Sequence, residues 1–233
     1  MFTACFDASG TVHDQPHLVV AGFIANANDW ISFDKEWRQR LRQEGISYFH
    51  RVDCKYNKEE FVGWEVKADA KEKLLSDLIS IIKGNTYRYF GCIITNSILD
   101  SKLWTKIRDK FHLHAYAFAG VVSISQVYKW AYRSNIKTPI EWIFENGDDG
   151  KGELMECMKI HGLPPPVFKG KKDKQDKIGN IIPAFTGLQA ADFLAYELFQ
   201  LMKQVDKQSG SASPYLRQFN EKIGELQHLT VKS

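Results

Sequence analysis

Runs of apolar and β-branched residues predict strands in several parts of the chain. A short strand is expected at residues 3–7 and a longer apolar one at residues 18–24, with a turn signal at residues 8–10 between them. Strand-forming residues also dominate residues 87–95 and 140–145. The first pair resembles a hairpin, and the later strands alternate with helical segments.

Apolar residues at three- and four-residue spacing predict helices between and after these strands. In residues 29–44, Trp30, Phe33 and Trp37 follow this spacing, and Asp29 is expected to cap the helix. Residues 49–62 show no period, so we expect an irregular insertion after this first helix. Further helices are expected at residues 65–83, 109–132, 152–161 and 186–203.

This order of elements predicts the fold class and the number of domains. Strands first, followed by strands and helices in alternation, indicate an α/β protein with a mixed sheet flanked by helices. No internal repeat or long linker divides the sequence, so residues 1–233 are expected to form one domain. Hydrophobic residues make up 44% of the chain, which is enough for a well-formed core.

Composition and charge limit the classes of protein. The sequence shows no signal peptide and no apolar run approaching roughly 18 residues, so a cytoplasmic protein without a membrane partner is expected. The four cysteines have no CxxC spacing and are expected to be free thiols. The net charge is only +3, so any binding of nucleic acid must be local. Nothing in the sequence indicates the oligomeric state.

Acidic residues stand at positions that favour a shared site. Asp7 and Glu145 end predicted strands, and Asp192 lies on the shoulder of the apolar stripe in the last long helix. An ionised carboxylate that faces a sheet is costly unless it is paired or binds a metal ion. Carboxylate oxygens alone suit Mg²⁺ or Mn²⁺. The residues expected to bind such an ion are Asp7, Glu145 and Asp192, with Asp148 as an auxiliary ligand.

Simpler interpretations of the same residues stay open. Asp7 is also placed to cap the turn that follows it, and Glu145 and Asp148 are of a type common in turns. For an inward-facing Asp192, an arginine or backbone donors are the alternative to a metal ion. Glu197 lies on a different face of the same helix and is expected to be solvated.

Five motifs of the chain resemble a known bacterial family. They are FDASG at the start, DWISFDKEW, YFHRVD, FENGDDG and the late GLQAADFLAYE. This set is similar to the family called domain of unknown function 3800, over nearly the whole chain. The resemblance implies a ribonuclease-H-like fold and a metal-dependent nuclease site, in a family that includes members associated with mobile elements and phage defence.

The resemblance also implies roles for residues of this chain. Asp7 and Asp192 match the first and last motifs and would be metal ligands, together with Glu145 or Asp148. The opening departs from the DESG form that is common in the family, because Ala8 replaces the acidic residue. A second acid beside Asp7 is therefore missing.

Two further groups of residues complete the hypothesis. His50 and Asp53, in YFHRVD, are candidates for a general base or an additional ligand, because imidazole titrates near neutrality. Lysines of the segment KGKKDKQDK are expected to contact phosphates without reading bases. Single-stranded RNA or DNA is the expected partner, since no recognition helix is apparent. The lysines concerned are Lys169, Lys171, Lys172 and Lys174.

The sequence therefore predicts hydrolysis of a phosphodiester by a metal-activated water. The catalytic residues would be Asp7, Glu145, Asp192 and His50. A non-catalytic module that binds nucleic acid or protein is the main alternative. FDASGTV also resembles the opening of haloacid-dehalogenase-type phosphatases, in which an acid stands two residues after a nucleophilic aspartate. Ser9 takes that position here, and an inward Asp192 would be unexplained.

Overall fold

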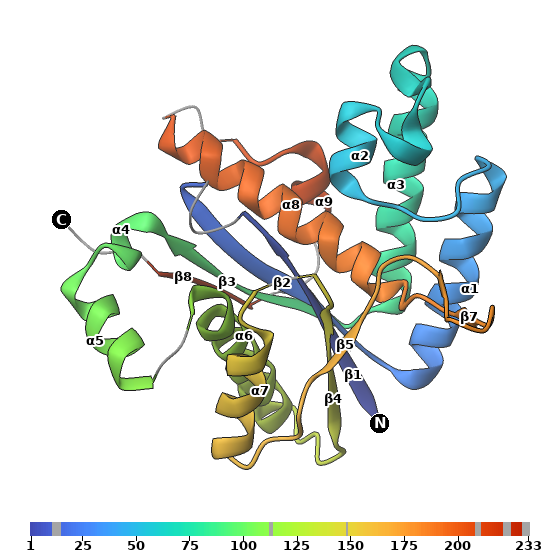
Figure 1. Ribbon diagram of the computed structural model, residues 1–233. Helices are drawn as coiled ribbons and strands as arrows, with labels where there is room; N and C mark the ends of the chain where they lie inside the picture. Colours follow the sequence, from blue (N-terminus) through green and yellow to red (C-terminus); the bar gives the residue numbers. More distant parts are fainter. Residues whose placement is uncertain (11–14, 112–113, 148, 208–210, 221–224, 230–233) are drawn as a thin grey trace.

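A six-stranded sheet runs through the molecule in the order β5-β4-β1-β2-β3-β8 (Figure 1). β2 is antiparallel to β1 and β3, whereas β1 and β4, β4 and β5, and β3 and β8 form parallel pairs. A separate two-stranded ribbon is made by β6 and β7. The strands are β1 Phe2–Ser9, β2 His17–Asn26, β3 Arg88–Thr95, β4 Ile140–Glu145, β5 Val167–Lys169, β6 Lys174–Gln175, β7 Ile181–Ile182 and β8 Glu225–Leu229.

The mixed α/β class expected from the sequence is confirmed by this arrangement. The computed structural model describes residues 1–10, 15–111, 114–147, 149–207, 211–220 and 225–229. Within these ranges, no helix has both the length and the apolar character needed to cross a membrane.

Helices cover both faces of the sheet, and each face has its own apolar core (Figure 1). The first core lies under α1, α3, α8 and α9, and the second under α6 and α7. The helices are α1 Ala27–Gln43, α2 Arg51–Tyr56, α3 Ala68–Asn85, α4 Asn96–Leu99, α5 Lys102–Phe111, α6 Ala115–Arg133, α7 Lys151–Ile160, α8 Gly187–Asp206 and α9 Pro214–Asn220.

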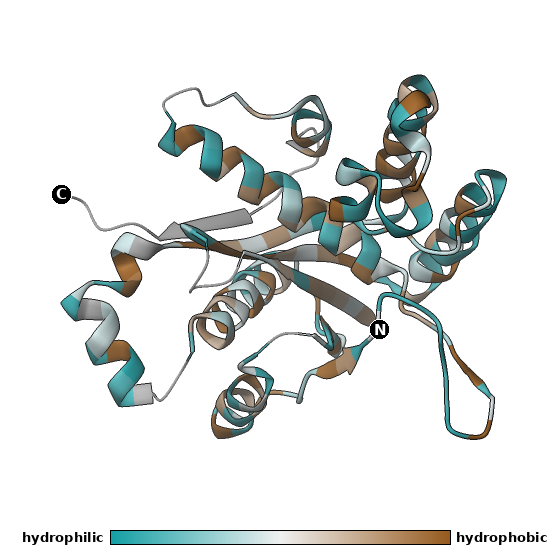
Figure 2. Cartoon of the chain, turned by 45° about the horizontal axis from the view of Figure 1, so that its top comes forward, coloured by the Kyte–Doolittle hydropathy of each residue, from teal (hydrophilic) through white to brown (hydrophobic). Residues whose placement is uncertain are grey.

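The alternation of side chains along β1 divides them between the two cores. Cys5 belongs to the core under α8, whereas Ala4 and Phe6 belong to the core under α6. The central strands are accordingly apolar along most of their length (Figure 2). Since side chains alternate, Asp7 follows Cys5 onto the α8 face of the sheet. β1 therefore directs the carboxylate of Asp7 toward the helix that contains Asp192.

Several helix and strand boundaries agree with the sequence. β4 has the expected bounds, and α7 and α8 lie within a few residues of theirs. The first helix begins earlier than expected, at Ala27, because the side chain of Asn26 accepts a hydrogen bond from the backbone N–H of Asp29 at 2.9 Å. The expectation that Asp29 caps this helix is therefore wrong.

Two further predictions, for residues 49–62 and residues 109–132, differ from the structure. The insertion at residues 49–62 is not wholly irregular, because it includes α2 and a short 3₁₀ turn at Glu59–Phe61. The single helix expected at residues 109–132 is wrong, since α5 ends at Phe111 and α6 begins at Ala115. His114 has extended backbone dihedrals, which a continuous helix does not allow.

All four cysteines are free, as expected from their spacing. Cys5, Cys54 and Cys92 are buried, and Cys157 is half-buried. Burial raises the pKa of the Cys54 thiol to about 11 and that of Cys92 to about 12. These two thiols therefore stay protonated near neutral pH and belong to the packing of the cores.

Candidate functional site

Two buried carboxylates, one from β1 and one from α8, flank the ammonium group of Lys171. Lys171 Nζ lies 2.8 Å from Asp7 Oδ2 and 3.3 Å from Asp192 Oδ1. Only 3% of Asp7 and 5% of Asp192 is exposed. The structure thus brings together the two acids from opposite ends of the sequence, with a lysine from the loop after β5 between them.

The second oxygen of each carboxylate accepts a backbone N–H. Asp7 Oδ1 accepts from Ala8 at 2.8 Å, and Asp192 Oδ2 accepts from Arg51, the first residue of α2, at 2.7 Å. The simpler interpretation of Asp192 therefore describes one of its oxygens, which is held by a backbone donor; the turn expected at residues 8–10 is wrong for Ala8 and Ser9, which belong to β1, so Asp7 accepts from a strand residue. The other oxygen of each carboxylate faces the lysine.

A close approach of α8 to its neighbours places Asp192 at this position. A Cβ atom on Gly187, the first residue of the helix, would lie 2.6 Å from the ring of Phe185 and 2.9 Å from that of Trp30. Cys5 Sγ also donates to the carbonyl oxygen of Gly187 at 3.3 Å. The glycine that opens GLQAAD thus allows the helix to pack directly on β1 and α1.

Glu145 and Asp148 were the other expected ligands. Glu145 ends β4, is half-buried and lines the same pocket as Lys171. Its negative charge adds to that of Asp7 and Asp192 in attracting the lysine. Asp148 lies outside the described residues, so its place in the site stays a prediction.

Electrostatics keep Lys171 charged. Burial by itself lowers the pKa of its ammonium group, but the charges of Asp192, Asp7 and Glu145 and the hydrogen bond to Asp7 together outweigh burial. The net result is a pKa above the usual value for lysine. A full positive charge therefore stands between the two aspartates at any physiological pH.

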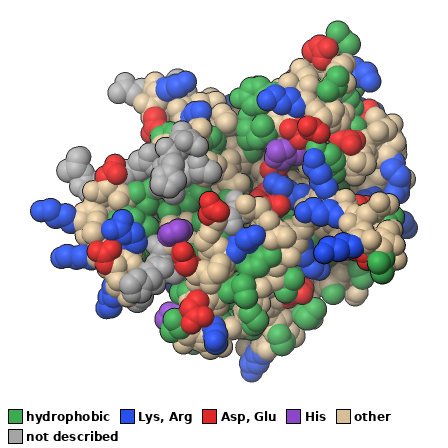
Figure 3. Space-filling view, in the orientation of Figure 1, with side chains coloured by type: hydrophobic (Ala, Val, Ile, Leu, Met, Phe, Trp, Pro, Cys, Tyr) green, Lys and Arg blue, Asp and Glu red, His purple; other side chains and the backbone are tan. Residues whose placement is uncertain are grey.

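A pocket of about 340 Å³ opens beside this ion-pair cluster. Basic and acidic side chains and a histidine gather on this face, where α2 meets the loop that leads from β5 to β7 (Figure 3). Residues that line the pocket include Tyr48, His50, Asp53, Glu145, Lys171 and Lys172. Charged and hydrogen-bonding side chains therefore make up much of the lining of the pocket.

His50 joins two carboxylates at the wall of the pocket. Its Nδ1 lies 2.8 Å from Asp53 Oδ2, and its Nε2 lies 3.5 Å from Asp192 Oδ1. The hydroxyl of Tyr48 donates to the same oxygen of Asp53 at 3.2 Å. Burial and the negative charge of Asp53 raise the pKa of Tyr48, so its hydroxyl stays a donor. Asp53 thus fixes the orientation of the imidazole ring.

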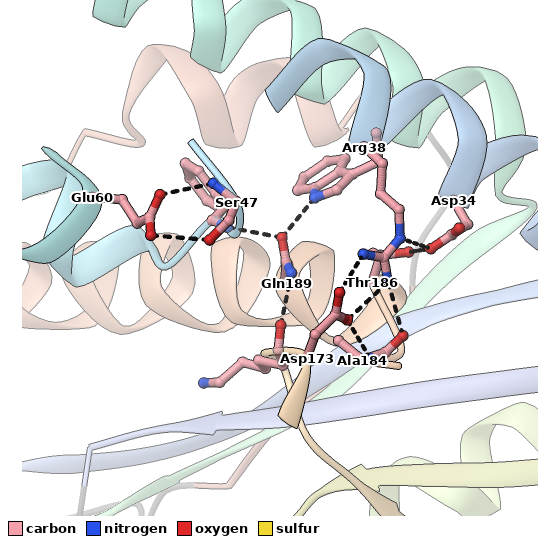
Figure 4. Close-up of polar contacts among 11 residues, drawn as sticks. Asp34, Arg38, Ser47, Glu60, Asp173, Ala184, Thr186 and Gln189 are labelled. Atoms are coloured by element: carbon pink, nitrogen blue, oxygen red, sulfur yellow. Dashed lines mark hydrogen bonds and ion pairs between the residues drawn. The ribbon is translucent and has the colours of Figure 1, made fainter. Parts of the chain in front are cut away.

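Gln189 is a part of the site that the sequence analysis missed. Its side-chain oxygen accepts from Trp37 Nε1 at 2.7 Å and from the Phe49 backbone N–H at 2.9 Å (Figure 4). Its amide nitrogen donates to the carbonyl oxygen of Lys171 at 2.7 Å. Gln189 precedes Asp192 by three positions, which places both on one face of a helix, so this spacing was a usable signal.

The ion pair between Arg51 and Glu197 was also missed. Arg51 Nε and one terminal nitrogen each lie 2.8 Å from Glu197 Oε1, and Ser213 donates to the other oxygen of Glu197. Only 2% of Glu197 is exposed, so the expectation that it is solvated is wrong. The physical reason is that α2 and α9 cover the outer side of α8.

The lysines of the loop after β5 do not share one environment. Lys171 points to the acids, Lys172 Nζ lies 3.8 Å from the ring centre of Tyr48, and Lys169 Nζ lies 5.5 Å from that of Phe185. Lys174 is exposed. Lys171 is therefore engaged within the protein, whereas Lys172 and Lys174 stay accessible at the pocket and on β6.

The loop itself is fastened to α1. Arg38 donates to Asp173 at 3.1 Å and to Asp34 at 2.9 Å, and Asp173 accepts from the backbone N–H of Ala184 at 2.7 Å (Figure 4). The hydrogen bond from Ala184 and the contact with Arg38 lower the pKa of Asp173. Together with the bond from Gln189, these contacts hold the backbone at Lys171 and two residues after it.

The donor chemistry of the site fits a hard divalent cation. Asp7, Asp192 and Glu145 offer only oxygen atoms, which Mg²⁺ and Mn²⁺ prefer. No cluster of three or more histidine, cysteine or acidic residues suited to a metal ion is found in the part of the chain that the structure describes. The ammonium of Lys171 stands where such an ion would contact both aspartates, so binding a metal ion there requires this side chain to move.

No protein-family model matches the chain, and no curated protein matches it.

Proposed function

We propose that the protein is a divalent-metal-dependent nuclease with a ribonuclease-H-like fold. The observation that carries the proposal is the convergence of Asp7 and Asp192 at one point beside a polar pocket. The mixed sheet supports it, because β1, β4 and α8 bring Asp7, Glu145 and Asp192 to the same end of the fold. An acidic cluster of this kind suits the binding of a divalent metal ion, and of a phosphate through that ion, rather than an apolar ligand.

In this proposal the chain's own residues hold and orient the reactants. Asp7, Asp192 and Glu145 would hold Mg²⁺ or Mn²⁺, with Asp148 as a further candidate; the bound ion would activate a water and stabilise charge on the phosphate. His50 stands at the pocket wall, oriented by Asp53, where it can accept a proton from the attacking water. Lys172 and Lys174 offer positive charge to the phosphates of a strand.

The proposed substrate is single-stranded RNA or DNA. The described helices near the pocket are packed against the sheet or against each other, and the accessible lysines lie on a loop and on β6. Such an arrangement contacts the backbone of a strand without reading base edges in a groove.

The Asp192→Asn variant tests the proposal. Asparagine keeps the size of the side chain and its oxygen acceptor but removes the charge that a metal ion needs, so cleavage should fall by more than about a hundredfold. End-labelled single-stranded RNA and DNA oligonucleotides with Mn²⁺ provide the assay. Asp109→Asn, at an exposed position on α5, is the matched control and should cleave like wild type. Full activity of Asp192→Asn would contradict the proposal.

The second candidate is a non-catalytic nucleic-acid-binding module, and the position of Lys171 favours it. An aspartate pair neutralised by a lysine is stable without any metal ion. Oligonucleotide binding that EDTA leaves unchanged, without strand cleavage in Mn²⁺ or Mg²⁺, would support this candidate over the nuclease.

A further inference from the structure

The ammonium of Lys171 and a divalent cation need the same place. Lys171 Nζ contacts one oxygen of Asp7 and one of Asp192, and the charge of Glu145 also acts on it. These oxygens face Lys171, which lines the pocket, while the other oxygen of each aspartate accepts a backbone N–H. A lysine and a metal ion therefore cannot both use the aspartate pair.

We propose that Lys171 is an internal counter-cation that closes the acidic site, and that a phosphate group in the pocket draws it away and opens the aspartate pair to a divalent ion. This inference rests on the proposed function and adds that binding of the substrate and binding of the metal ion are coupled. The anionic substrate and the metal ion bind together, and each binds weakly without the other.

Removing the positive charge from an unliganded site is costly. Asp7 and Asp192 are almost fully buried, and two ionised carboxylates that converge on one point repel each other strongly unless a cation lies between them. The lysine therefore stabilises the folded protein in the absence of metal. A metal ion can therefore bind the aspartates only if its interaction with them is more favourable than that of Lys171.

The side chain is placed so that it can leave without moving the backbone. Lys171 lines the pocket, and about 19% of its side chain is exposed, in contrast to the aspartates that it contacts. Its backbone carbonyl is held by Gln189, and Asp173, two residues later, is held by Arg38 and by the N–H of Ala184 (Figure 4). The four-carbon stem can therefore pivot from a fixed point into the pocket.

The pocket offers an anion a second cation. Lys172 also lines it, with its ammonium 3.8 Å from the ring centre of Tyr48. A phosphate that enters between the two lysines can replace the aspartates as the acceptor for Lys171, because charge-assisted hydrogen bonds to phosphate are comparable to those to carboxylate. The exchange leaves the aspartates uncompensated, which raises their affinity for a divalent ion by the same factor as the ion raises the affinity for phosphate.

The decisive measurement is calorimetric titration of Mn²⁺ into full-length wild type and Lys171→Met. Methionine keeps much of the apolar stem but removes the charge, so Mn²⁺ should bind Lys171→Met at least about tenfold more tightly than wild type. Lys171→Arg keeps the charge, and Lys177→Met removes an exposed charge from the same loop. Lys177→Met should bind Mn²⁺ like wild type, and Lys171→Arg should bind Mn²⁺ less tightly than Lys171→Met.

Sulfate at matched ionic strength, with chloride as the reference, tests the role of the anion. Sulfate is a tetrahedral dianion that stands in for a phosphate group. It should tighten Mn²⁺ binding to wild type several-fold but not to Lys171→Met, which has no lysine to draw away. Pairing of sulfate with free Mn²⁺ in solution would affect the titrations of both proteins equally. Lys171→Met is therefore the control for this effect.

Thermal unfolding supplies an independent readout. Without metal, Lys171→Met should unfold at a lower temperature than wild type, and Mn²⁺ should raise its unfolding temperature more than it raises that of wild type. If Lys171→Met does not fold, the response of wild-type Mn²⁺ binding to sulfate decides the question, because the inference requires tighter binding in sulfate and an unchanged affinity would overturn it.

The outcomes separate this inference from the proposed function. Equal Mn²⁺ affinity in wild type and Lys171→Met, with no effect of sulfate, would overturn the inference; if Asp192→Asn then abolished that binding and cleavage, the nuclease proposal would stand. An absence of Mn²⁺ binding in wild type and Lys171→Met, with and without sulfate, would overturn the inference and the metal-dependent nuclease together.

Discussion

At the scale of single residues, His50 is the group best placed to move a proton. It lies between Asp53, which fixes its ring, and Asp192, which belongs to the acidic cluster. A side chain that contacts both the pocket and the cluster can take a proton from a water bound there. In the proposed mechanism Asp53 would act only by holding the ring of His50 in place.

We expect His50→Gln to reduce the single-turnover rate of cleavage by about a hundredfold, because glutamine has no titratable ring nitrogen. Asp53→Asn should cause a smaller loss, since it loosens the ring without removing it. The rates are measured on an oligonucleotide that wild type cleaves. His161→Gln, at an exposed position beyond α7, is the control. Equal rates in wild type and His50→Gln would remove His50 from the mechanism.

The acids of the site were readable from the sequence because each stands at a position with a defined direction. Asp7 follows the alternation of a strand, and Asp192 follows the apolar stripe of a helix. Lys171 belongs to a loop with several lysines and no period, so nothing in the sequence distinguishes the one that turns inward. Its ion pairs depend on the tertiary packing of the loop on α1 and α8.

At the scale of elements, the ion pair of Arg51 and Glu197 fastens α2 to α8. The guanidinium of Arg51 also lies between 5.0 and 5.5 Å from the ring centres of Phe193, Tyr196 and Tyr215. The backbone N–H of the same arginine donates to Asp192. The arginine side chain therefore holds in place the helix start that orients Asp192.

Arg51→Met should lower the free energy of unfolding by about 3–5 kcal/mol, since it leaves the buried Glu197 without its partner. The double variant Arg51→Met/Glu197→Gln should be more stable than Arg51→Met, because no unpaired buried charge remains. Urea denaturation measures both. Arg108→Met, which breaks an exposed pair with Asp109, should cost at most about 1 kcal/mol. A loss of that small size in Arg51→Met would show that the buried pair contributes little.

The elements with strong periodic patterns were predictable, and those fixed by local breaks were not. β4, α7 and α8 have long apolar patterns with clear ends. The break at His114 follows no glycine or proline, so the apolar pattern of residues 109–132 gave no reason to divide it. Glu197 was misplaced because the pattern of α8 cannot show that α2 and α9 cover its outer side.

At the scale of the whole molecule, the net charge of +3 is too small to attract nucleic acid by itself. The accessible positive charge beside the pocket comes from lysines of the loop after β5, among them Lys172 and Lys174. Binding of a single strand should therefore depend on few ionic contacts. The dependence of the binding constant on salt concentration measures the number of these ionic contacts.

Lys172→Gln should weaken oligonucleotide binding and reduce the slope of log K against log salt concentration by about 0.7, the value for one phosphate contact on a single strand. Fluorescence anisotropy of a labelled oligonucleotide at several salt concentrations measures the slope. Lys73→Gln, at an exposed position on α3, should leave the slope unchanged. An unchanged slope in Lys172→Gln would place the strand elsewhere on the protein.

The distance in sequence between the two aspartates has a consequence for synthesis of the protein. Asp7 leaves the ribosome 164 residues before Lys171, and Asp192 follows 21 residues after Lys171. The cluster that joins these three residues therefore forms late in co-translational folding. A nascent or prematurely terminated chain that stops before α8 contains Asp7 without its partner, so such a fragment would lack the metal site of the proposed function.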